Sequence, residues 1–559
     1  MRRAINMDYN KLAELLFPHI DKTPEDYEKL FPKRSLSESA MVTRLGPSPT
    51  GFIHLGNLYG AFVDERLAHR SGGIFYLRIE DTDDKRYVEG AVETIISSLK
   101  FFGIDFDEGA LLDGESGSYG PYFQSRRGEI YQCFAKELVK RSLAYPCFLT
   151  EEELSEIRSA QEASKETTGI YGKYAQKSRE LSYDEIKANI ESGKSYVVRL
   201  KSSGNHDMPS DEIRHIKVED AIRGTLSMPE NNQDVIILKA TGIPTYHFAH
   251  VIDDHFMRTT HVVRGEEWLM SLPIHVELFE KLGFDMPVYC HTAVLMKLDN
   301  GNKRKLSKRK DPELSLDYYR QEGYHPQAVK EYLLTILNSN FEEWRIENPD
   351  ASIDDFKFTT EKMSSGGALF DLNKLNDISK DVLVKIPASE LAVFMADWAR
   401  EFRPEILPLF EEDKEYIEKI LDLGRDGNKP RKDLVYAAQI FDFISYFFDD
   451  YFTIEDSLPE NVSDEDAVQI LTKYLDTYNH SDDQSRWFDK IRAIAEEMGY
   501  AAKPKDFKKN PDLYKGHVGH VSTAIRIAVM GRSQSPDIWE IQQILGEDRT
   551  RERIKTLII

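Results

Sequence analysis

The chain has 559 residues, a formal net charge of −23 at pH 7 and three cysteines. One hydrophobic core rarely grows beyond about 250 to 300 residues, so this length predicts several domains. No apolar run approaches the roughly 18 residues of a membrane span, no charged-then-apolar leader is present, and three cysteines make no disulfide framework. These features argue against a membrane-spanning or secreted protein and predict a cytoplasmic one.

Residues 1–40 form an acidic and aromatic extension. Its apolar residues predict one helix, and they are Leu12, Leu15, Leu16 and Phe17. No motif in the extension indicates a role.

The stretch 41–120 begins with a strand, a tight loop and a helix. Met41–Leu45 has strand character, and two prolines and a glycine follow it. Apolar residues then recur at helical spacing: Leu58, Phe62 and Leu67. A helix N-terminus offers unpaired N–H groups to a phosphate, and a glycine lets a ligand approach the backbone. With His54 and Asn57 as side-chain donors, the sequence predicts a phosphate-binding turn rather than an ordinary loop with a satisfied histidine.

Further strands and an insertion follow in chain order. Ile74–Ile79 predicts the next strand and completes the first half of a nucleotide-binding α/β fold. The insertion 121–242 contains one helical and two strand-like runs: Glu129–Leu143, Tyr196–Leu200 and Val235–Leu238. The second half of the α/β fold returns in 243–295.

A dense cationic run, Lys303–Lys310, comes next in a chain that is otherwise acidic. Such a run is typical of a solvated surface or a nucleic-acid patch. Leu306 and Ser307 favour another interpretation, because an apolar anchor and a hydroxyl can position a mobile phosphate-binding loop. Lys305 and Lys308 would then stabilise charge on a triphosphate.

The last part of the chain, 381–559, has a helical pattern. One face collects apolar side chains: Leu434, Ala438, Ile440, Phe441, Ile444 and Phe447. The sequence therefore predicts an α/β part followed by an all-helical part.

Two of these motifs together resemble one family, the bacterial-type glutamyl-tRNA synthetases, which are class I aminoacyl-tRNA synthetases. His54 to Asn57 is similar to the HIGH signature and Lys305 to Arg309 to the KMSKS signature. The likeness continues through Gly73–Asp83, Gly103–Gly109, Pro244–Ala249, Arg264–Trp268 and Gly366–Asp371. It covers 41–380 well and the C-terminal third more loosely. Asn57 departs from the signature's second histidine, which members with glutamate specificity often lack.

The resemblance implies a class I Rossmann-like catalytic domain with an acceptor-binding insertion, followed by an all-α anticodon-binding domain. It implies six parts: the extension 1–40, the first catalytic half 41–120, the tRNA acceptor-binding insertion 121–242, the second catalytic half 243–295, the KMSKS loop and stem-contact region 296–380, and the helical anticodon-binding domain 381–559. Helices at Gly519–Arg532 resemble glutamyl enzymes rather than glutaminyl enzymes, which use β-barrels. A helical bundle with no RNA role is the alternative.

The activity implied is ATP-dependent activation of L-glutamate to glutamyl-adenylate and transfer to the 3′-terminal adenosine of tRNA(Glu), releasing AMP and pyrophosphate. The implied catalytic residues are His54, Asn57, Lys305, Ser307 and Lys308. The implied ATP-binding residues are Pro49, Thr50, Gly51, His54, Gly56, Asn57, Lys305, Lys308 and Arg309. Mg²⁺ would accompany ATP, held mainly by phosphate oxygens. No side chain of the motifs is an obvious general base.

Amino-acid choice requires a pocket that pairs two carboxylates and one ammonium group. Arg44 and Arg264 are suitable cations, because the planar guanidinium meets a carboxylate bidentately. The resemblance places Glu80 on the α-ammonium and Tyr246 beside the substrate, and Ser48 can add a donor. Glutamine would be rejected because a buried arginine would lack its anionic partner.

Many bacterial relatives carry zinc in the insertion, on a Cys-x-Cys pair, a tyrosine and a further cysteine. The matching positions here are Cys147, Leu149, Tyr174 and Ser178. Tetrahedral zinc requires four donors, and leucine and serine supply no thiolate. We therefore expect no structural zinc and no metal held by the protein.

The partners implied are L-glutamate and tRNA(Glu), with tRNA(Gln) open as a second substrate, no membrane, and a monomeric chain. The net charge of −23 is in tension with tRNA binding, although a large acidic protein can present a local positive surface. Three alternatives stay open: a glutaminyl enzyme, a glutamyl-queuosine type enzyme, and a retired paralogue that binds tRNA without catalysis. The long C-terminal part disfavours the second, and His54 paired with Lys305 and Lys308 disfavours the third.

Overall fold

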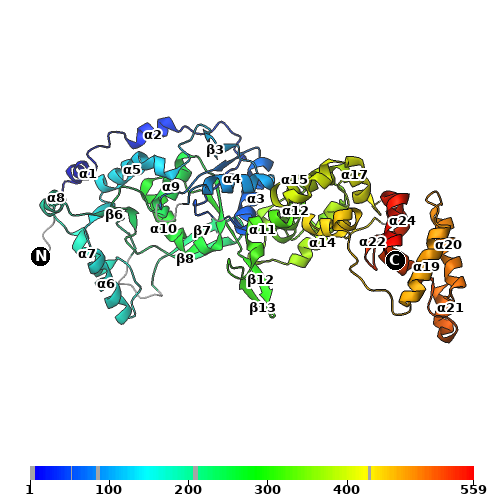
Figure 1. The fold of residues 1–559 in the computed structure, drawn as a ribbon. Helices are drawn as coiled ribbons and strands as arrows, with labels where there is room; N and C mark the ends of the chain where they lie inside the picture. Colours follow the sequence, from blue (N-terminus) through cyan, green and yellow to red (C-terminus); the bar gives the residue numbers. More distant parts are fainter. Residues whose placement is uncertain (1–6, 52, 84–87, 205–211, 426–429, 559) are drawn as a thin grey trace. The chain divides into compact units, whose positions relative to one another are not determined.

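The computed structural model describes residues 7–51, 53–83, 88–204, 212–425 and 430–558 (Figure 1). The chain forms two compact units. Unit 1 comprises Met1–Asp317 and Lys330–Asp371, and unit 2 comprises Tyr318–Val329 and Leu372–Ile559. In the described ranges, no helix is long and apolar enough to cross a membrane. The six-part division expected from the sequence is finer than these two units and stays a prediction.

The described part of the N-terminal extension, residues 7–40, contains two helices, the predicted one around Leu12 and a second that was not predicted. These are α1 (Tyr9–Leu16) and α2 (Pro24–Leu30). Pro18 cannot continue α1, because proline lacks the N–H that a helix interior needs. Thr23 then starts α2 with a reciprocal capping box to Asp26. The apolar side of α1 packs into the core that contains helix α5 (Gly128–Lys140).

Parallel strands build the first half of the α/β fold as predicted. The sheet consists of β1 (Val42–Leu45), β2 (Ile74–Leu77) and β3 (Glu108–Leu111), with β4 (Gly114–Ser116) antiparallel at the edge. Helices α3 (Leu55–Arg70) and α4 (Ala91–Phe101) connect these strands. All four residues of β1 are buried, as expected for a strand covered on both faces.

The second half of the fold lies beside the first. Its sheet has the order β10 (His261–Gly265), β11 (Val288–Thr292), β7 (His215–Asp220) and β8 (Gly224–Pro229). Strands β7 and β8 lie within the range 121–242 predicted for the insertion, yet β7 pairs with β11 of this half. Helix α9 (Tyr246–Phe256) precedes β10, and α10 (Leu272–Leu282) follows it. The Thr260 backbone N–H donates to the Val42 carbonyl at 2.9 Å, so β10 begins next to β1. Residues from both halves can therefore share one site.

The insertion folds around a small antiparallel sheet. Its strands are β5 (Ala144–Cys147), β6 (Val197–Leu200) and β9 (Ile236–Leu238). Its helices are α5 (Gly128–Lys140), α6 (Glu151–Ala163), α7 (Gly172–Arg179) and α8 (Tyr183–Glu191). The two predicted strand-like runs and the predicted helix are present with slightly shorter bounds.

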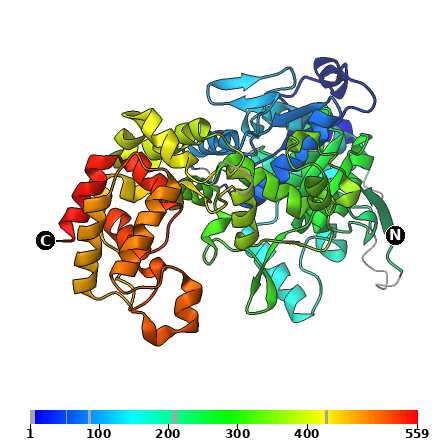
Figure 2. The same ribbon diagram turned by 90° about the vertical axis from the view of Figure 1, so that its right-hand side faces the viewer.

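A hairpin that the sequence analysis missed leads into the cationic run. Strands β12 (Leu295–Asp299) and β13 (Asn302–Lys305) pair antiparallel, and β14 (Ala368–Leu369) pairs parallel with β12. The turn is Asn300-Gly301, with φ of 49° and 81°, a residue pair that two-residue hairpins favour. The hairpin projects from unit 1 in both views (Figures 1 and 2).

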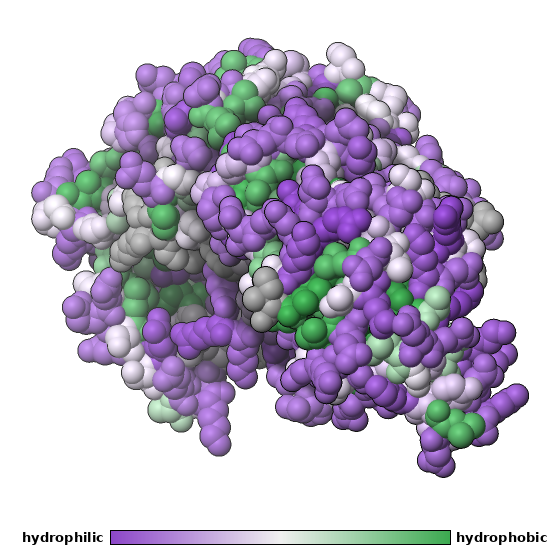
Figure 3. Space-filling model, turned by 45° about the vertical axis from the view of Figure 1, so that its right-hand side comes forward, coloured by the Kyte–Doolittle hydropathy of each residue, from purple (hydrophilic) through white to green (hydrophobic). Residues whose placement is uncertain are grey.

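Apart from β14, helices make up the regular elements described after β13. Helices α11 (Leu316–Glu322) and α12 (Pro326–Leu337) carry residues of both units, and α13 (Phe341–Glu347) belongs to unit 1. Unit 2 continues with α14 (Leu372–Leu383), α15 (Ala388–Phe402), α16 (Leu407–Glu411), α17 (Lys414–Asp422), α18 (Ala437–Ile444), α19 (Asp464–Thr477), α20 (Gln484–Glu497), α21 (Pro504–Lys509), α22 (Val518–Met530), α23 (Ile538–Leu545) and α24 (Glu547–Thr556). Hydrophilic side chains dominate the face drawn in Figure 3, with apolar side chains in small patches.

The predicted apolar helical face at 434–447 is only partly helical. Helix α18 covers 437–444, whereas Leu434 precedes it and Phe447 lies in a 3₁₀ turn after it. Both outliers are nevertheless buried in the core of unit 2. The pattern therefore identified five buried residues and one partly buried residue, Ala438, but not the ends of the helix.

Candidate active site

A cavity of about 520 Å³ lies in unit 1 where the carboxyl ends of β1 and β10 meet the β12–β13 hairpin. Crevices at the carboxyl ends of parallel strands are the usual ligand sites of α/β folds. Nine of the predicted site residues line it: Arg44, Ser48, His54, Gly56, Asn57, Glu80, Tyr246, Arg264 and Lys305. Six do not: Pro49, Thr50, Gly51, Ser307, Lys308 and Arg309. Phe52, in the middle of the first motif, lies outside the described residues.

His54 and Asn57 cap the start of α3, a role that the sequence analysis missed. The Asn57 N–H donates to His54 Nδ1 at 3.2 Å, and the His54 N–H donates to Asn57 Oδ1 at 3.0 Å. Because a backbone N–H can only donate, Nδ1 accepts and the neutral ring carries its proton on Nε2. Burial, and the charges of Lys308 and Lys305, lower the pKa of His54. The ring is thus a neutral donor near pH 7.

Two glycines leave room for functional side chains. A Cβ at Gly56 would lie 3.0 Å from ring atoms of His54, and a Cβ at Gly46 would lie 2.5 Å from Glu80 Oε1. Close approach of a neighbouring group is one reason for glycine at a site. A side chain at either position would therefore displace His54 or Glu80, which both line the cavity.

Asp311 organises the cationic run, and nothing in the spacing of the run indicated it. Arg304 Nη1 and Nη2 donate to Asp311 at 2.6 and 2.7 Å, and the Ser307 N–H donates to it at 2.9 Å. The Arg304 hydrogen bonds hold the pKa of Asp311 well below its usual range. Leu306 is buried, as an anchor should be. For Ser307, the contact to Asp311 is made by the backbone N–H rather than the hydroxyl.

Arg44 belongs to a buried cluster in which positive and negative charges balance. Its Nε donates to Asp254 Oδ1 at 3.1 Å. Arg78 links Asp254 to Glu80, because its Nη1 donates to Asp254 Oδ1 at 2.7 Å and its Nη2 donates to Glu80 Oε1 at 3.0 Å. Burial opposes the ionisation of Asp254, but Arg44 and Arg78 outweigh it and hold the pKa of Asp254 well below its usual range. Burial raises the pKa of Glu80 although Arg78 opposes the shift. Asp254 and Arg78 were not predicted.

Arg264 and Tyr246 come together as predicted, but with unpredicted neighbours. Arg264 Nη1 donates to the Tyr246 hydroxyl at 3.4 Å and to His275 Nδ1 at 3.0 Å, and its Nε donates to His291 Nε2 at 2.9 Å. The Tyr246 ring packs against Trp268, with centroids 4.4 Å apart. The side chain of Arg264 is therefore fixed by neutral groups of α9, α10 and β11.

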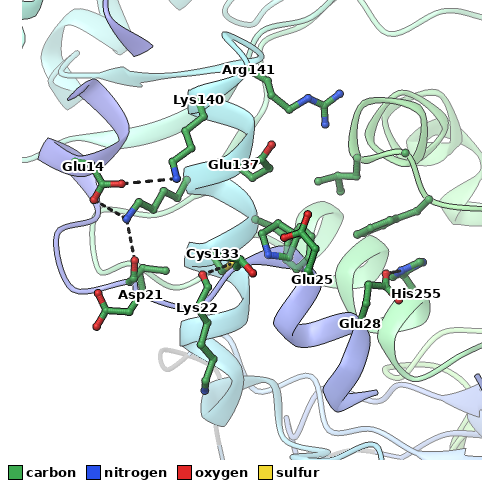
Figure 4. Close-up of a pocket in the computed structure, with 18 residues that line it drawn as sticks. Glu14, Asp21, Lys22, Glu25, Glu28, Cys133, Glu137, Lys140, Arg141 and His255 are labelled. Atoms are coloured by element: carbon green, nitrogen blue, oxygen red, sulfur yellow. Dashed lines mark hydrogen bonds and ion pairs between the residues drawn. The ribbon is translucent and has the colours of Figure 1, made fainter. Parts of the chain in front are cut away.

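A second cavity of unit 1, about 540 Å³, lies between the N-terminal extension and helices α5 and α10 (Figure 4). Several of its charges pair within its own wall: Lys136 Nζ lies 2.8 Å and Lys140 Nζ 3.7 Å from Glu14, and His255 Nε2 lies 2.6 Å from Glu28. These contacts attach the extension to the rest of unit 1 and indicate a structural function.

Two of the four positions compared with zinc ligands lie together. Ser178 Oγ is 3.5 Å from Cys147 Sγ. Within the described part of the chain, no group of three or more His, Cys, Asp or Glu residues could hold a metal ion. One thiol and one hydroxyl are fewer than the four donors that zinc requires. The absence of structural zinc stays a prediction.

Unit 2 has a cavity of about 390 Å³ between α20, α22 and α23. Trp487, Phe488 and Arg526 line it, and Arg526 Nη1 donates to the Ser533 carbonyl at 3.0 Å. Aromatic rings and a guanidinium plane are the groups on which unpaired nucleobases stack. This cavity is the candidate nucleic-acid site of unit 2.

Comparisons with known proteins agree with this geometry. Residues 40–377 match the family described as tRNA synthetases class I (E and Q), catalytic domain, and residues 513–558 match an anticodon binding domain. The chain is 65% identical over 553 residues to a glutamate–tRNA ligase of Acetivibrio thermocellus, covering 99% of this chain and 100% of that protein. It is 49% identical to one of Clostridium perfringens, covering 98% and 100%.

A similar solved structure is a glutamate tRNA ligase from Elizabethkingia meningosepticum in complex with its amino acid. It has a TM-score of 0.73 and 29% sequence identity, and the match covers 93% of this chain and 99% of that chain.

Proposed function

Since this chain belongs to the class I tRNA synthetases for glutamate and glutamine, we propose that it is a glutamate–tRNA ligase, which activates L-glutamate with ATP and transfers it to tRNA(Glu). The observation that carries the proposal is the cavity that joins the capped turn of His54, the hairpin end at Lys305, and the two arginines Arg44 and Arg264. One side suits phosphates and the other suits a dicarboxylic amino acid.

In the first step, the α-carboxylate of glutamate attacks the α-phosphorus of ATP. The Nε2–H of His54 and the N-terminus of α3 hold phosphate oxygens, while Lys305 and Lys308 stabilise the charge that moves onto pyrophosphate. Glu80 pairs with the α-ammonium group, and Arg44 and Arg264 pair with carboxylates. Glutamyl-adenylate and pyrophosphate result.

Mg²⁺ would neutralise phosphate charge as ATP binds. The described residues offer no dedicated metal cluster, which suits an ion held through phosphate oxygens. In the second step, the terminal adenosine of tRNA attacks the activated carbonyl through its 2′-hydroxyl and releases AMP. The insertion would present the acceptor end, and unit 2 would bind the anticodon.

Finer points belong to the same proposal. We expect a monomeric cytoplasmic enzyme, and the three free, buried cysteines suit a reducing compartment. Sedimentation at micromolar concentration tests the monomer, and metal analysis of the purified protein tests the absence of zinc.

The testing experiment charges tRNA(Glu) and, separately, tRNA(Gln) with labelled glutamate, with labelled glutamine as the control. Charging of tRNA(Glu) alone supports a discriminating enzyme, and charging of both supports a non-discriminating one. Transfer of glutamine would contradict the proposal. Binding of tRNA without any charging would instead support a catalytically retired tRNA-binding paralogue.

A further inference from the structure

The two arginines of the cavity differ in how their charge is balanced. Arg44 forms an ion pair with Asp254, and both side chains are buried. Arg264 is also buried, but among the described residues no carboxylate oxygen lies within the 4.0 Å of an ion pair from its guanidinium. An uncompensated buried cation is costly unless a ligand supplies the counter-charge. Of the two arginines, Arg264 is therefore the one whose charge is left for a substrate anion.

Imidazoles occupy the places where carboxylates usually hold an arginine. Arg264 Nε donates to His291 Nε2 at 2.9 Å, and Nη1 donates to His275 Nδ1 at 3.0 Å. A guanidinium can only donate, so both ring nitrogens must accept. A protonated imidazole has no acceptor nitrogen, and both rings are therefore neutral in this arrangement.

The remaining ring nitrogens fit the same tautomers. His275 Nε2 lies 3.1 Å from His247 Nδ1, and His291 Nδ1 lies 2.6 Å from Asp220 Oδ2. Burial lowers the pKa of His275 well below its usual value and also lowers that of His291, although Asp220 opposes the second shift. The carboxylate of Asp220 is thus separated from Arg264 by the imidazole of His291. Backbone N–H groups of Ile222 and Arg223 also donate to Asp220 Oδ1.

One donor of Arg264 stays unmet. Nη2 is buried and has no hydrogen-bond partner among the described residues, and the guanidinium lies over the Tyr289 ring at 4.6 Å. Arg264 lines the cavity beside Tyr246 and Thr292. A buried unsatisfied donor at a ligand cavity favours a ligand that accepts from it.

We propose that His275 and His291 are positioning residues that hold Arg264 by neutral acceptors, so that its charge is reserved for the side-chain carboxylate of the substrate and glutamate is selected over glutamine. This inference rests on the proposed function and deepens it. Glutamine has the shape of glutamate but brings no counter-charge, which leaves the guanidinium buried and unpaired. A carboxylate in place of either imidazole would balance Arg264 internally and remove the advantage of glutamate.

The test uses two substitutions at one position that differ in charge alone. In His275→Asn and His275→Asp, the side-chain oxygen replaces Nδ1, and only the second adds a negative charge. In the full-length enzyme, kcat and KM for glutamate, glutamine and ATP are measured by charging of tRNA(Glu).

We expect His275→Asn to keep the ratio of kcat/KM for glutamate over glutamine within about fivefold. We expect His275→Asp to lower that ratio by about tenfold or more, which is the size of effect expected when a buried charge pair is lost. The loss should appear mainly in the KM for glutamate, and the KM for ATP should change less than about threefold. A merely structural role would make the two variants lose activity toward both amino acids alike.

A second matched pair of variants, at His291, serves the same test if the His275 variants do not fold. His291→Gln places a neutral oxygen, and His291→Glu a charged one, near the position of Nε2, and we expect the same difference between them. Equal discrimination in folded Asn and Asp variants would overturn the inference. So would a wild-type KM for glutamine within about tenfold of that for glutamate. Wild-type protein that charges no tRNA with glutamate would instead refute the proposed function.

Discussion

Replacing Gly46 by alanine tests whether the position of the Glu80 carboxylate determines the use of glutamate. The added Cβ would lie 2.5 Å from Glu80 Oε1 and 3.0 Å from Cδ. Ordinary van der Waals contact begins near 3.4 Å. Glu80 Oε1 must therefore move away from the added Cβ by about 0.9 Å, from 2.5 to 3.4 Å. Gly46 is not among the glycines with positive φ, so alanine adds no backbone strain of its own.

The size of the effect follows from what Glu80 loses when it moves. Its Oε1 accepts from Arg78 Nη2 at 3.0 Å, and the proposed function places the α-ammonium of glutamate on the same carboxylate. A hydrogen bond between charged groups contributes about 1.5–3 kcal/mol. At about 1.4 kcal/mol for each factor of ten, we expect kcat/KM for glutamate to fall roughly 10- to 150-fold in Gly46→Ala.

The assay is charging of tRNA(Glu) at varied glutamate and, separately, at varied ATP. The KM for ATP should change less than about threefold, because His54 and Lys305 are untouched. Gly60→Ala is the matched control: Gly60 also lines the cavity, but nothing lies within 4 Å of its added Cβ. A folded Gly46→Ala enzyme with wild-type kinetics for glutamate would refute the reasoning, and so would an equal loss toward ATP.

Three further predictions concern other parts of the chain. Lys308→Ala should lower the rate of ATP–pyrophosphate exchange about 100-fold or more, whereas Lys310→Ala should leave it near wild type; equal effects would contradict the assigned role. Arg526→Ala should raise the KM for tRNA about tenfold without changing the KM for ATP, because base stacking contributes roughly 1–3 kcal/mol per base; unchanged tRNA binding in a filter assay would exclude this cavity. Burial lowers the pKa of His247 to about 4 and of His250 to about 3, from 6.5. Below pH 6.5 the unfolded chain then binds more protons, so urea denaturation should show stability falling from pH 6.5 toward pH 4; a flat profile would contradict the buried neutral state.

Local patterns were sufficient to predict the elements that carry the motifs. The strand, turn and helix around His54 follow from residues adjacent in the chain, since a strand run, a proline–glycine turn and apolar helical spacing are each local signals. The β12–β13 hairpin had an equally local signal in Asn300-Gly301, which the sequence analysis overlooked. The extension forms a second helix beyond the predicted one because Pro18 prevents α1 from continuing and Thr23 starts α2.

The partners of the site residues could not be predicted in the same way. Asp254 lies 210 positions after Arg44, and His291 lies 27 positions after Arg264. The first contact exists because the two half-sheets meet, and the second because β10 and β11 pair with Arg264 opposite His291. No periodicity along the chain relates such positions. Asp311 follows Arg304 closely, yet its contact depends on the fold of the cationic run. Residue spacing thus indicated which cations line the cavity, but not which of them are already neutralised.

The difference between neutralised and unneutralised cations explains how a strongly acidic chain can keep an anion site. A chain of net charge −23 has more carboxylates than cations, so a buried arginine easily acquires an internal counter-ion, as Arg44 does. Arg264 escapes because neutral acceptors fill the positions around it, and Lys305 lines the same cavity with no carboxylate within 4.0 Å in the part of the chain that the structure describes. Net charge sets the long-range field, which salt screens beyond about 10 Å. Affinity for an anion instead depends on the few groups around the cation that binds it, and around Arg264 those groups are uncharged histidines and a tyrosine.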